Sequence, residues 1–179
     1  MNKELIDIIN EDGIKTGDIL PRSEIHKKGL WHRSIIIAII NEKKEILLQQ
    51  RSDNKEKNAG MWDISVAGHV EAGQDAISAA LRELKEEMNI ELRENDYKNF
   101  KFIFSYRSKI KYTDDFIENQ FYEFFILQKN GLNIQDLKIQ KSEVQSIKFA
   151  NLAELQKMIT QKKMVDREPI FYELIKYLK

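Results

Sequence analysis

The sequence predicts an α/β fold, an α/β/α sandwich built around a mixed β-sheet. Short segments rich in β-branched and aromatic residues recur along the chain, and polar turns separate them. Apolar residues repeat at helical spacing in the middle of the chain and near its end. The 179 residues contain no internal repeat, low-complexity tract or linker, so residues 1–179 are predicted to form a single domain.

The first half of the chain is predicted to supply mainly strands. In order, the sequence predicts a strand and turn (4–13), a short helical or irregular lead-in (22–29), a β-hairpin (30–40 with 46–52), a polar loop (52–60) and a short strand (61–66). This last strand leads into a loop that begins at Gly68.

The second half alternates helices with strands. The sequence predicts a helix (75–88), two long segments that pair as an antiparallel hairpin (100–110 and 116–127), a further strand (142–150) and two helices near the end. Asn151 is a suitable N-cap for the helix over 152–161, and Pro169 suits the first turn of the last helix. The total is about three helices on one sheet.

Composition excludes several classes of function. The 29 basic and 29 acidic residues give a net charge of +0, so no broad field attracts nucleic acid or anionic membrane. Without cysteine, a metal must be held by oxygen or imidazole. The acidic start of the chain has no apolar core of signal-peptide length, and the longest apolar run (34–40) is too short to span a bilayer. A soluble, cytoplasmic protein is therefore expected.

The helix over 75–88 carries an unfavourable group of acids. An apolar stripe is predicted to face the core, and a different arc carries three glutamates below a wall of alanines. The stripe is Ile77, Leu81, Leu84 and Met88, and the other arc is Glu83, Glu86 and Glu87 with Ala76, Ala79 and Ala80. Like charges at this spacing cost about 0.2–0.5 kcal/mol per pair, and acids near a helix C-terminus cost about 0.3–1 kcal/mol each.

A metal ion would relieve this repulsion. Gly68 and Gly73 allow the preceding loop to approach the alanine wall closely. Carboxylates together with a loop carbonyl form a hard-oxygen site suited to Mg²⁺ or Mn²⁺. The alternative interpretation is a solvated acidic face.

Residues 68–90 resemble the Nudix box, in which glycine, five residues, glutamate and seven residues precede R-E-U-x-E-E-x-G-U, with U aliphatic. Here the pattern reads Gly68, Gln74, Arg82, Glu83, Leu84, Lys85, Glu86, Glu87, Met88, Asn89 and Ile90. The order of the flanking strands is also similar to that family, which implies a Nudix-type α/β/α sandwich. Gln74 replaces the usual glutamate, so neutral hydrogen bonds are expected where the family has an ion pair. Asn89 replaces a glycine and can still adopt the left-handed conformation of a C-terminal cap.

The resemblance implies a metal-dependent hydrolase site. Gly68, Glu83, Glu86 and Glu87 are then the metal ligands, for Mg²⁺ or Mn²⁺, and Arg82 orients a glutamate. The metal lowers the pKa of a water, which attacks phosphorus as hydroxide while a phosphate leaves. The general base is Glu83 or a glutamate outside the box. The catalytic residues are Arg82, Glu83, Glu87 and Glu118. Glu123 is the alternative to Glu118, on the opposite face of the same predicted strand.

The wider stretch 56–73 resembles the Nudix branch that includes isopentenyl-diphosphate isomerase. That enzyme requires a cysteine before "GH" and an E-x-E pair, whereas this chain has Ala67 and the sequence Glu118-Asn119-Gln120. Alanine and an amide cannot move the isomerase's protons, so the resemblance points to the hydrolases that lack this cysteine.

Further residues are expected to contact substrate or metal. Arg51 and Lys55 match basic positions that contact the diphosphate in this branch, although Lys55 has the alternative of a solvated loop charge. His69 is expected to line the pocket. His26, His32 and His69 match metal-binding positions of the isomerase, so a second metal site and a set of ordinary surface or hydrogen-bonded histidines are both open.

The sequence thus predicts hydrolysis of a diphosphate linkage in a nucleoside diphosphate joined to another group. One alternative is a non-catalytic nucleotide-binding or regulatory module, suggested by Gln74, and another is the isomerase. The partner is a small nucleotide-like diphosphate rather than nucleic acid or membrane, and a homodimer remains among the options.

Overall fold

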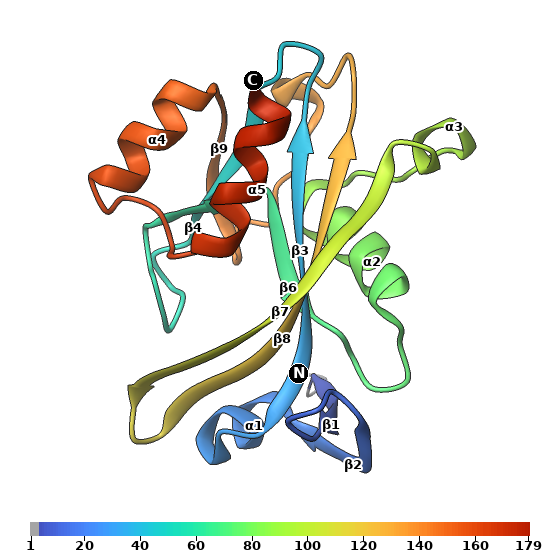
Figure 1. Cartoon of the computed structure of the whole chain (residues 1–179), viewed down its shortest axis with the longest axis vertical. Coiled ribbons are helices and arrows are strands. Elements are labelled where there is room, and N and C mark those ends of the chain that lie inside the picture. Colours follow the sequence, from blue (N-terminus) through green and yellow to red (C-terminus); the bar gives the residue numbers. More distant parts are fainter. Residues whose placement is uncertain (1–3) are drawn as a thin grey trace.

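The computed structural model describes residues 4–179 and contains two β-sheets flanked by helices (Figure 1). The strands are β1 (Leu5–Ile9), β2 (Lys15–Pro21), β3 (Trp31–Ile40), β4 (Ile46–Arg51), β5 (Trp62–Ile64), β6 (Val66–His69), β7 (Phe100–Thr113), β8 (Phe116–Gln128) and β9 (Val144–Ala150). The helices are α1 (Arg22–Lys28), α2 (Ala76–Met88), α3 (Glu94–Tyr97), α4 (Leu152–Thr160) and α5 (Glu168–Leu178), with a 3₁₀ turn at Ile134–Asp136.

The main sheet is mixed, as predicted. Its seven strands run in the order β5-β4-β3-β8-β7, with β6 also paired to β3 and β9 to β4. The pair β3–β8 is parallel and the other pairs are antiparallel. Strands β1 and β2 form a separate antiparallel pair.

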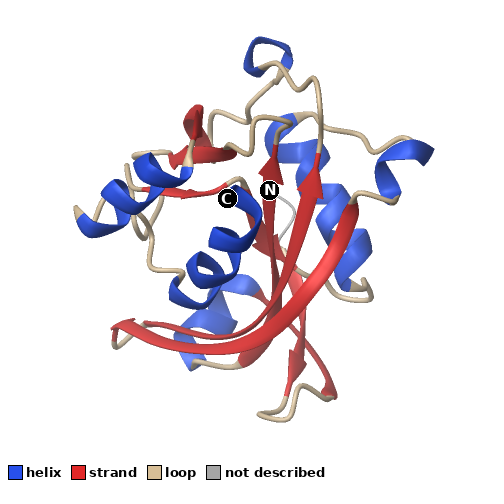
Figure 2. Cartoon of the chain, turned by 45° about the horizontal axis from the view of Figure 1, so that its top comes forward, coloured by secondary structure: helices blue, strands red, loops and turns tan. Residues whose placement is uncertain are grey.

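Helices cover both faces of this sheet, which confirms the α/β sandwich (Figure 2). Alternate residues of β3 enter two hydrophobic cores: Ile36 and Ala38 pack with α4 and α5, while Ile35 and Ile37 pack with α2. A strand buried on both faces reads as a continuous apolar run, which explains the segment 34–40.

The hairpin predicted from 30–40 and 46–52 forms only next to its turn. Strands β3 and β4 pair at Ile40 and Ile46 alone and then diverge. The edges of β3 are occupied by β6 and β8, and those of β4 by β5 and β9, so each strand recruits neighbours distant in sequence. The hairpin of β7 and β8 is confirmed along its length and forms the long curved ribbon of Figure 2.

The predicted helix caps are confirmed. The Asn151 side chain accepts from the Glu154 N–H at the start of α4, and Pro169 lies in the first turn of α5. Three strands or α-helices escaped the sequence analysis: β2, whose residues are mostly exposed, the four-residue helix α3, and β6, which contains Gly68 and His69 where a loop was expected. The first two lack the apolar periodicity on which such predictions rest, and β6 is too short to show it.

The prediction of which face of α2 is buried is wrong in part. Leu84 and Met88 are buried as predicted, but Ile77 is 55% exposed. In place of Ile77, the alanine wall and the side chains of Glu83 and Glu87 turn inward. Small alanine side chains let the helix lie close to β3 and β6, and this close approach carries the acids toward the sheet.

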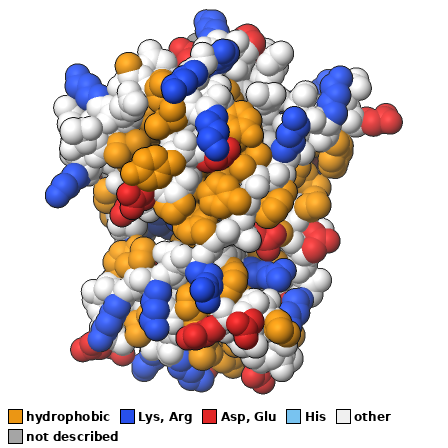
Figure 3. Space-filling view, viewed as in Figure 1, with side chains coloured by type: hydrophobic (Ala, Val, Ile, Leu, Met, Phe, Trp, Pro, Cys, Tyr) orange, Lys and Arg blue, Asp and Glu red, His pale blue; other side chains and the backbone are white. Residues whose placement is uncertain are grey.

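The outer surface carries mixed charge. Figure 3 shows basic and acidic side chains interspersed on the face viewed in Figure 1, in keeping with the net charge of +0. Among the helices within residues 4–179, none combines the length and apolar composition needed to cross a membrane.

Candidate active site

The loop before α2 and the helix itself form the base of the site. Asp75 caps the helix by accepting from the Ser78 N–H at 2.7 Å. At the other end Asn89 has φ 55°, the left-handed conformation expected of it, and its N–H donates to the Lys85 carbonyl. The departure from glycine at this position is therefore accommodated without a change of cap.

Gly68 lies against Glu83. In β6 it pairs with Ile35, and a Cβ atom added to it would lie 2.0 Å from the Glu83 Oε1 atom. Only glycine leaves room for that carboxylate beside the strand. Gly68 thus approaches α2 closely, but the expectation is wrong in part: Gly68 belongs to strand β6 and not to a loop, it meets Glu83 and not the alanine wall, and a Cβ on Gly73 would meet nothing within 4 Å.

Arg82 connects the loop with the acidic face. Its Nη1 donates to Glu83 Oε1 at 2.8 Å and to Glu86 Oε2 at 3.0 Å, and its Nη2 donates to the His69 carbonyl at 2.8 Å. Its Nε donates to Gln74 Oε1 at 3.4 Å. The neutral Gln74 amide thus accepts the hydrogen bond at the position where the Nudix box usually has a glutamate. The guanidinium thereby fixes the orientation of Glu83 relative to Gly68.

Two of the glutamates are buried. Glu83 and Glu87 are 9% and 5% exposed. Burial raises the pKa of Glu83 to about 7 although the Arg82 charge opposes the shift. Burial also raises the pKa of Glu87 well above its usual value, as do the charges of Glu83 and Glu143. Each carboxyl group therefore binds a proton more readily than an exposed glutamate, and a cation beside the pair would favour its ionised form.

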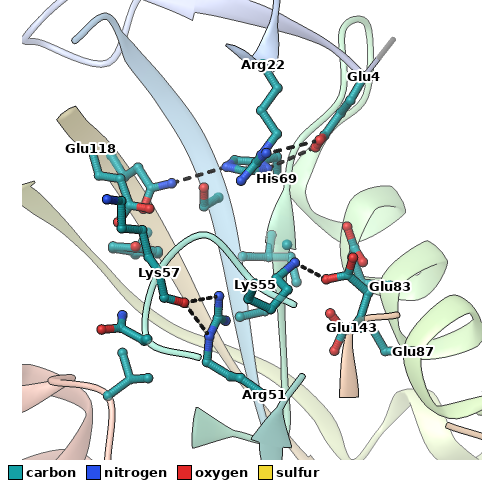
Figure 4. Close-up of a pocket in the computed structure, with 18 of the residues that line it drawn as sticks. Glu4, Arg22, Arg51, Lys55, Lys57, His69, Glu83, Glu87, Glu118 and Glu143 are labelled. Carbon is teal, nitrogen blue, oxygen red and sulfur yellow. Dashed lines mark hydrogen bonds and ion pairs between the residues drawn. The ribbon is translucent and has the colours of Figure 1, made fainter. Parts of the chain in front are cut away.

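These residues line a cavity of about 800 Å³ (Figure 4). Gly68, Glu86 and Arg82 line the same cavity as Glu83 and Glu87. From β8, Glu118, Gln120 and Tyr122 also reach it. Within the described part of the chain, Glu123 does not line this cavity, and its carboxylate lies 3.6 Å from Arg33 Nη1. The geometry favours Glu118 over Glu123 as the extra acid.

The three residues expected to bind substrate all line the cavity. Arg51 is held in place, since its Nε and Nη2 donate to the Lys57 carbonyl at 3.3 and 3.2 Å and its Nη1 lies 3.7 Å from Asp63 Oδ2. Lys55 forms an ion pair with Glu143 and is therefore not a purely solvated loop charge. His69 is oriented by Glu4, whose Oε1 is 2.9 Å from its Nδ1.

Sequence reasoning missed Glu143 as a site residue. It directly precedes β9, which pairs with β4, and the nearby Gln140 N–H donates to the Glu87 carbonyl at 3.1 Å. The sequence shows an acid before a strand but not that this strand lies beside β4. A long-range pairing brings Glu143 to Glu87, so no local signal identifies it.

The cavity also has a buried ion pair that the sequence did not suggest. Arg167 at the start of α5 donates from Nε and Nη2 to the two oxygens of Asp63, at 3.2 and 3.0 Å. Asp63 is 0% exposed, and the Arg167 guanidinium lies 4.9 Å from the centre of the Tyr122 ring. Asp63 thus orients both arginines of this wall, Arg51 and Arg167.

The three histidines form one cluster, and His26 and His32 are buried rather than on the surface. One ligand nitrogen from each of His26, His32 and His69 lies within 4.8 Å of the others. Burial lowers the pKa of His26 to about 4 and that of His32 to about 3, so both are neutral near pH 7. The Gln120 amide nitrogen lies 3.1 Å from His32 Nε2 and 3.3 Å from His69 Nε2.

His26 and His32 offer the neutral imidazoles that a transition metal prefers. The Nδ1 atoms of His32 and His69 contact the Leu30 carbonyl and Glu4, which fixes the two rings. An amide, Gln120, stands where the related isomerase branch has a carboxylate.

Comparison with known proteins shows which family this chain resembles and over which residues. The NUDIX domain pattern matches residues 30–173. Nudix hydrolase 3 of Arabidopsis thaliana is 32% identical over 90% of this chain, which spans only 21% of that protein. An uncharacterized Nudix hydrolase of Listeria monocytogenes is 32% identical over 84% of this chain and 81% of its own length.

An isopentenyl-diphosphate Δ-isomerase of Pectobacterium atrosepticum is 35% identical, over 46% of each chain. Among solved structures, DR0079 from Deinococcus radiodurans has a TM-score of 0.69 at 16% identity and covers 98% of this chain and 100% of its own. That structural likeness concerns the fold.

Proposed function

Because the chain belongs to the Nudix hydrolase family, we propose that it hydrolyses a diphosphate linkage in a nucleoside diphosphate joined to another group, with Mg²⁺ or Mn²⁺ at the acidic face of α2. The observation that carries the proposal is the burial of Glu83 and Glu87 beside Gly68 in one cavity. Burial raises the pKa of both carboxyl groups, so keeping the two ionised together is costly unless a cation engages them.

The donor set fits a hard divalent ion. Glu83, Glu86, Glu87 and the Gly68 carbonyl would hold it, since all are oxygen donors at one end of the cavity. When bound, such an ion lowers the pKa of a water and offsets the charge of the diphosphate. Glu118 and Glu143, from outside the helix, line the same cavity and offer further carboxylate oxygens.

The chain's own residues have separate tasks in this proposal. Arg82 keeps Glu83 turned toward Gly68, and a carboxylate, either Glu83 or one outside α2 such as Glu118 or Glu143, removes the proton of the attacking water. Arg51, Lys55 and His69 stand at the cavity wall where they would contact the phosphates. The departing phosphate leaves with the charge it gains when the P–O bond breaks.

The substrate class rests on the size and lining of the cavity. A volume of about 800 Å³ accommodates a ligand of nucleotide size. The wall away from α2 contains Asn58, Tyr112 and Asp166, which offer hydrogen-bonding groups and a ring for a nucleoside.

The isomerase alternative lacks its proton carriers. Ala67 has no acidic proton, and the Gln120 amide contacts two histidines instead of offering a carboxylate. The binding-module alternative differs from the enzyme in turnover alone, so calorimetry with parallel product analysis distinguishes the two.

A panel of nucleoside diphosphate conjugates with Mg²⁺ or Mn²⁺ tests the proposal. Phosphate-bearing products are expected from the wild type, and Glu87→Gln is expected to lose nearly all of the rate. Glu91→Gln is the matched control, because Glu91 lies just after the same helix and pairs with exposed Lys85 outside the cavity. Retained activity in Glu87→Gln would contradict the assignment.

A further inference from the structure

We propose that Lys55 is an exchangeable counter-ion: its ammonium holds Glu143 while no divalent cation is bound, and it transfers to the diphosphate when the cation binds. The inference rests on the proposed metal site and adds a coupling between metal and substrate. It makes Lys55 a positioning residue whose two partners are both in the same cavity.

The first observation is where the Lys55 ammonium lies. It forms an ion pair with Glu143, and both side chains are largely shielded, 23% and 35% exposed. Figure 4 shows Lys55 extending across the cavity toward Glu143 and the acidic side of α2. The ammonium therefore lies on the carboxylate side of the cavity.

The second observation is how the segment 52–55 is joined to the segment 140–143. The Ser52 N–H donates to the Glu143 carbonyl at 2.9 Å, the Lys55 N–H donates to the Ser52 carbonyl at 3.1 Å, and the Gln140 N–H donates to the Glu87 carbonyl at 3.1 Å. The backbones of Lys55, Glu143 and Glu87 are thus tied together. Movement of the ammonium then requires rotation of the Lys55 side chain, not movement of a loop.

The third observation is the charge that surrounds the ammonium. Glu83, Glu87 and Glu143 line the same cavity as Lys55, so its ammonium lies among acidic side chains. A divalent ion on the same oxygens makes the ammonium redundant there and repels it. The diphosphate supplies the alternative negative charge within the same cavity.

Lys55 has the chemistry for exchange and Arg51 does not. An ammonium on a four-carbon stem is a mobile point charge with three rotatable donors. Arg51 already donates to the Lys57 carbonyl and lies beside Asp63, so its guanidinium is fixed. The cavity wall therefore combines a fixed guanidinium, Arg51, with a mobile ammonium, Lys55, that can exchange Glu143 for the diphosphate.

The consequence is positive coupling between the two ligands. A bound metal frees Lys55 for the diphosphate, and a bound diphosphate draws Lys55 away from the metal's carboxylates. By linkage the two effects on affinity are equal. Removing the ammonium should tighten the binding of the metal when no diphosphate is present. It should also reduce the factor by which metal and diphosphate strengthen each other's binding.

Titration of the full chain with Mn²⁺, followed by the electron paramagnetic resonance signal of free Mn²⁺, tests this without turnover. Lys55→Met is expected to bind Mn²⁺ about fivefold more tightly than wild type. Lys57→Met is the control, because Lys57 lines the same cavity but lies over the rings of Tyr112 and Phe116, 5.2 and 4.8 Å from their centres. Its Mn²⁺ affinity should change less than about twofold.

A second titration adds methylenediphosphonate, a non-hydrolysable diphosphate. In the wild type Mn²⁺ should strengthen its binding by a larger factor than in Lys55→Met. In a Glu143→Gln background, Lys55→Met should no longer tighten Mn²⁺, since the partner of the ammonium is gone. Lys55→Gln repeats the measurement should the methionine variant fold poorly.

Unchanged or weaker Mn²⁺ binding by both folded Lys55 variants would overturn the exchange while leaving the metal site intact. Failure of the wild type to bind Mn²⁺ at all would instead overturn the metal site and with it the exchange.

Discussion

At the scale of single residues, the site depends on which atoms are absent as much as on which are present. Gly68 contributes no side chain, and the missing Cβ is what lets Glu83 Oε1 lie against β6. Gln74 contributes an amide to Arg82 without a charge, so Arg82 directs its strongest hydrogen bonds to Glu83, Glu86 and the His69 carbonyl.

Gly68→Ala should disable the site without unfolding the chain. The added Cβ would lie 2.0 Å from Glu83 Oε1, so the carboxylate must move by more than an ångström. A displacement of that size costs on the order of 100-fold in rate, measurable as kcat/KM on the best substrate of the panel. Gly73→Asn, in the same loop but with open space around its Cβ and a residue that tolerates positive φ, should retain most activity.

The histidine cluster should make the protein sensitive to acid. Burial lowers the pKa of His32 from 6.5 to about 3, so the unfolded chain binds this proton at a higher pH than the folded one. The stability that neutral His32 contributes is therefore complete above about pH 6.5 and is lost as pH falls toward 3.

The buried glutamates have the opposite sign, because their raised pKa values favour the folded state as pH falls. The difference in unfolding free energy between wild type and His32→Asn isolates the histidine. That difference should shrink from pH 7 to pH 5 in urea titrations, and a constant difference would count against a neutral buried His32.

At the scale of elements, α2 shows how a helix can bury charge. The periodicity of apolar residues indicated one face, but the helix packs on Ala76, Ala79 and Ala80 together with Leu84 and Met88. Turning the alanines to the sheet shortens the distance between helix and strands, and it brings Glu83 and Glu87 inside with them. The exposure of Ile77 is the cost of this orientation.

Substitutions on α2 should reveal its true buried face. Leu84→Ala removes a fully buried side chain and should destabilise the fold by about 2–5 kcal/mol. Ile77→Gln, on the face that is 55% exposed, should change stability by less than about 0.5 kcal/mol. Urea unfolding measures both, and a large loss for Ile77→Gln would support the orientation expected from periodicity instead.

At the scale of the whole molecule, the site is assembled from segments far apart in the chain. Local patterns predicted the hairpin of β7 and β8, the caps at Asn151 and Pro169, and the acidic helix with its glycine loop. They could not predict that β4 pairs with β9, which brings Glu143 to Lys55, nor that Arg167 reaches Asp63. Those contacts depend on strand order and on the return of α5 to the sheet, which no short segment encodes.

The Asp63–Arg167 pair should be a main link between α5 and the sheet. Asp63→Asn leaves the Arg167 charge buried without its partner and should cost about 3–5 kcal/mol of unfolding free energy. Replacing both residues, as Asp63→Asn with Arg167→Met, should recover part of that loss. Lys176→Met breaks an exposed ion pair on the same helix and should cost less than about 1 kcal/mol.

The most direct test of the central claim is Mn²⁺ binding to the full chain in the absence of any substrate. The wild type should bind the ion, Glu91→Gln should bind it equally well, and Glu87→Gln should bind it at least about tenfold more weakly, because one of the buried carboxylates has become a neutral amide. Equal Mn²⁺ affinity of wild type and Glu87→Gln, or no binding by either, would contradict a metal site on the acidic face of α2.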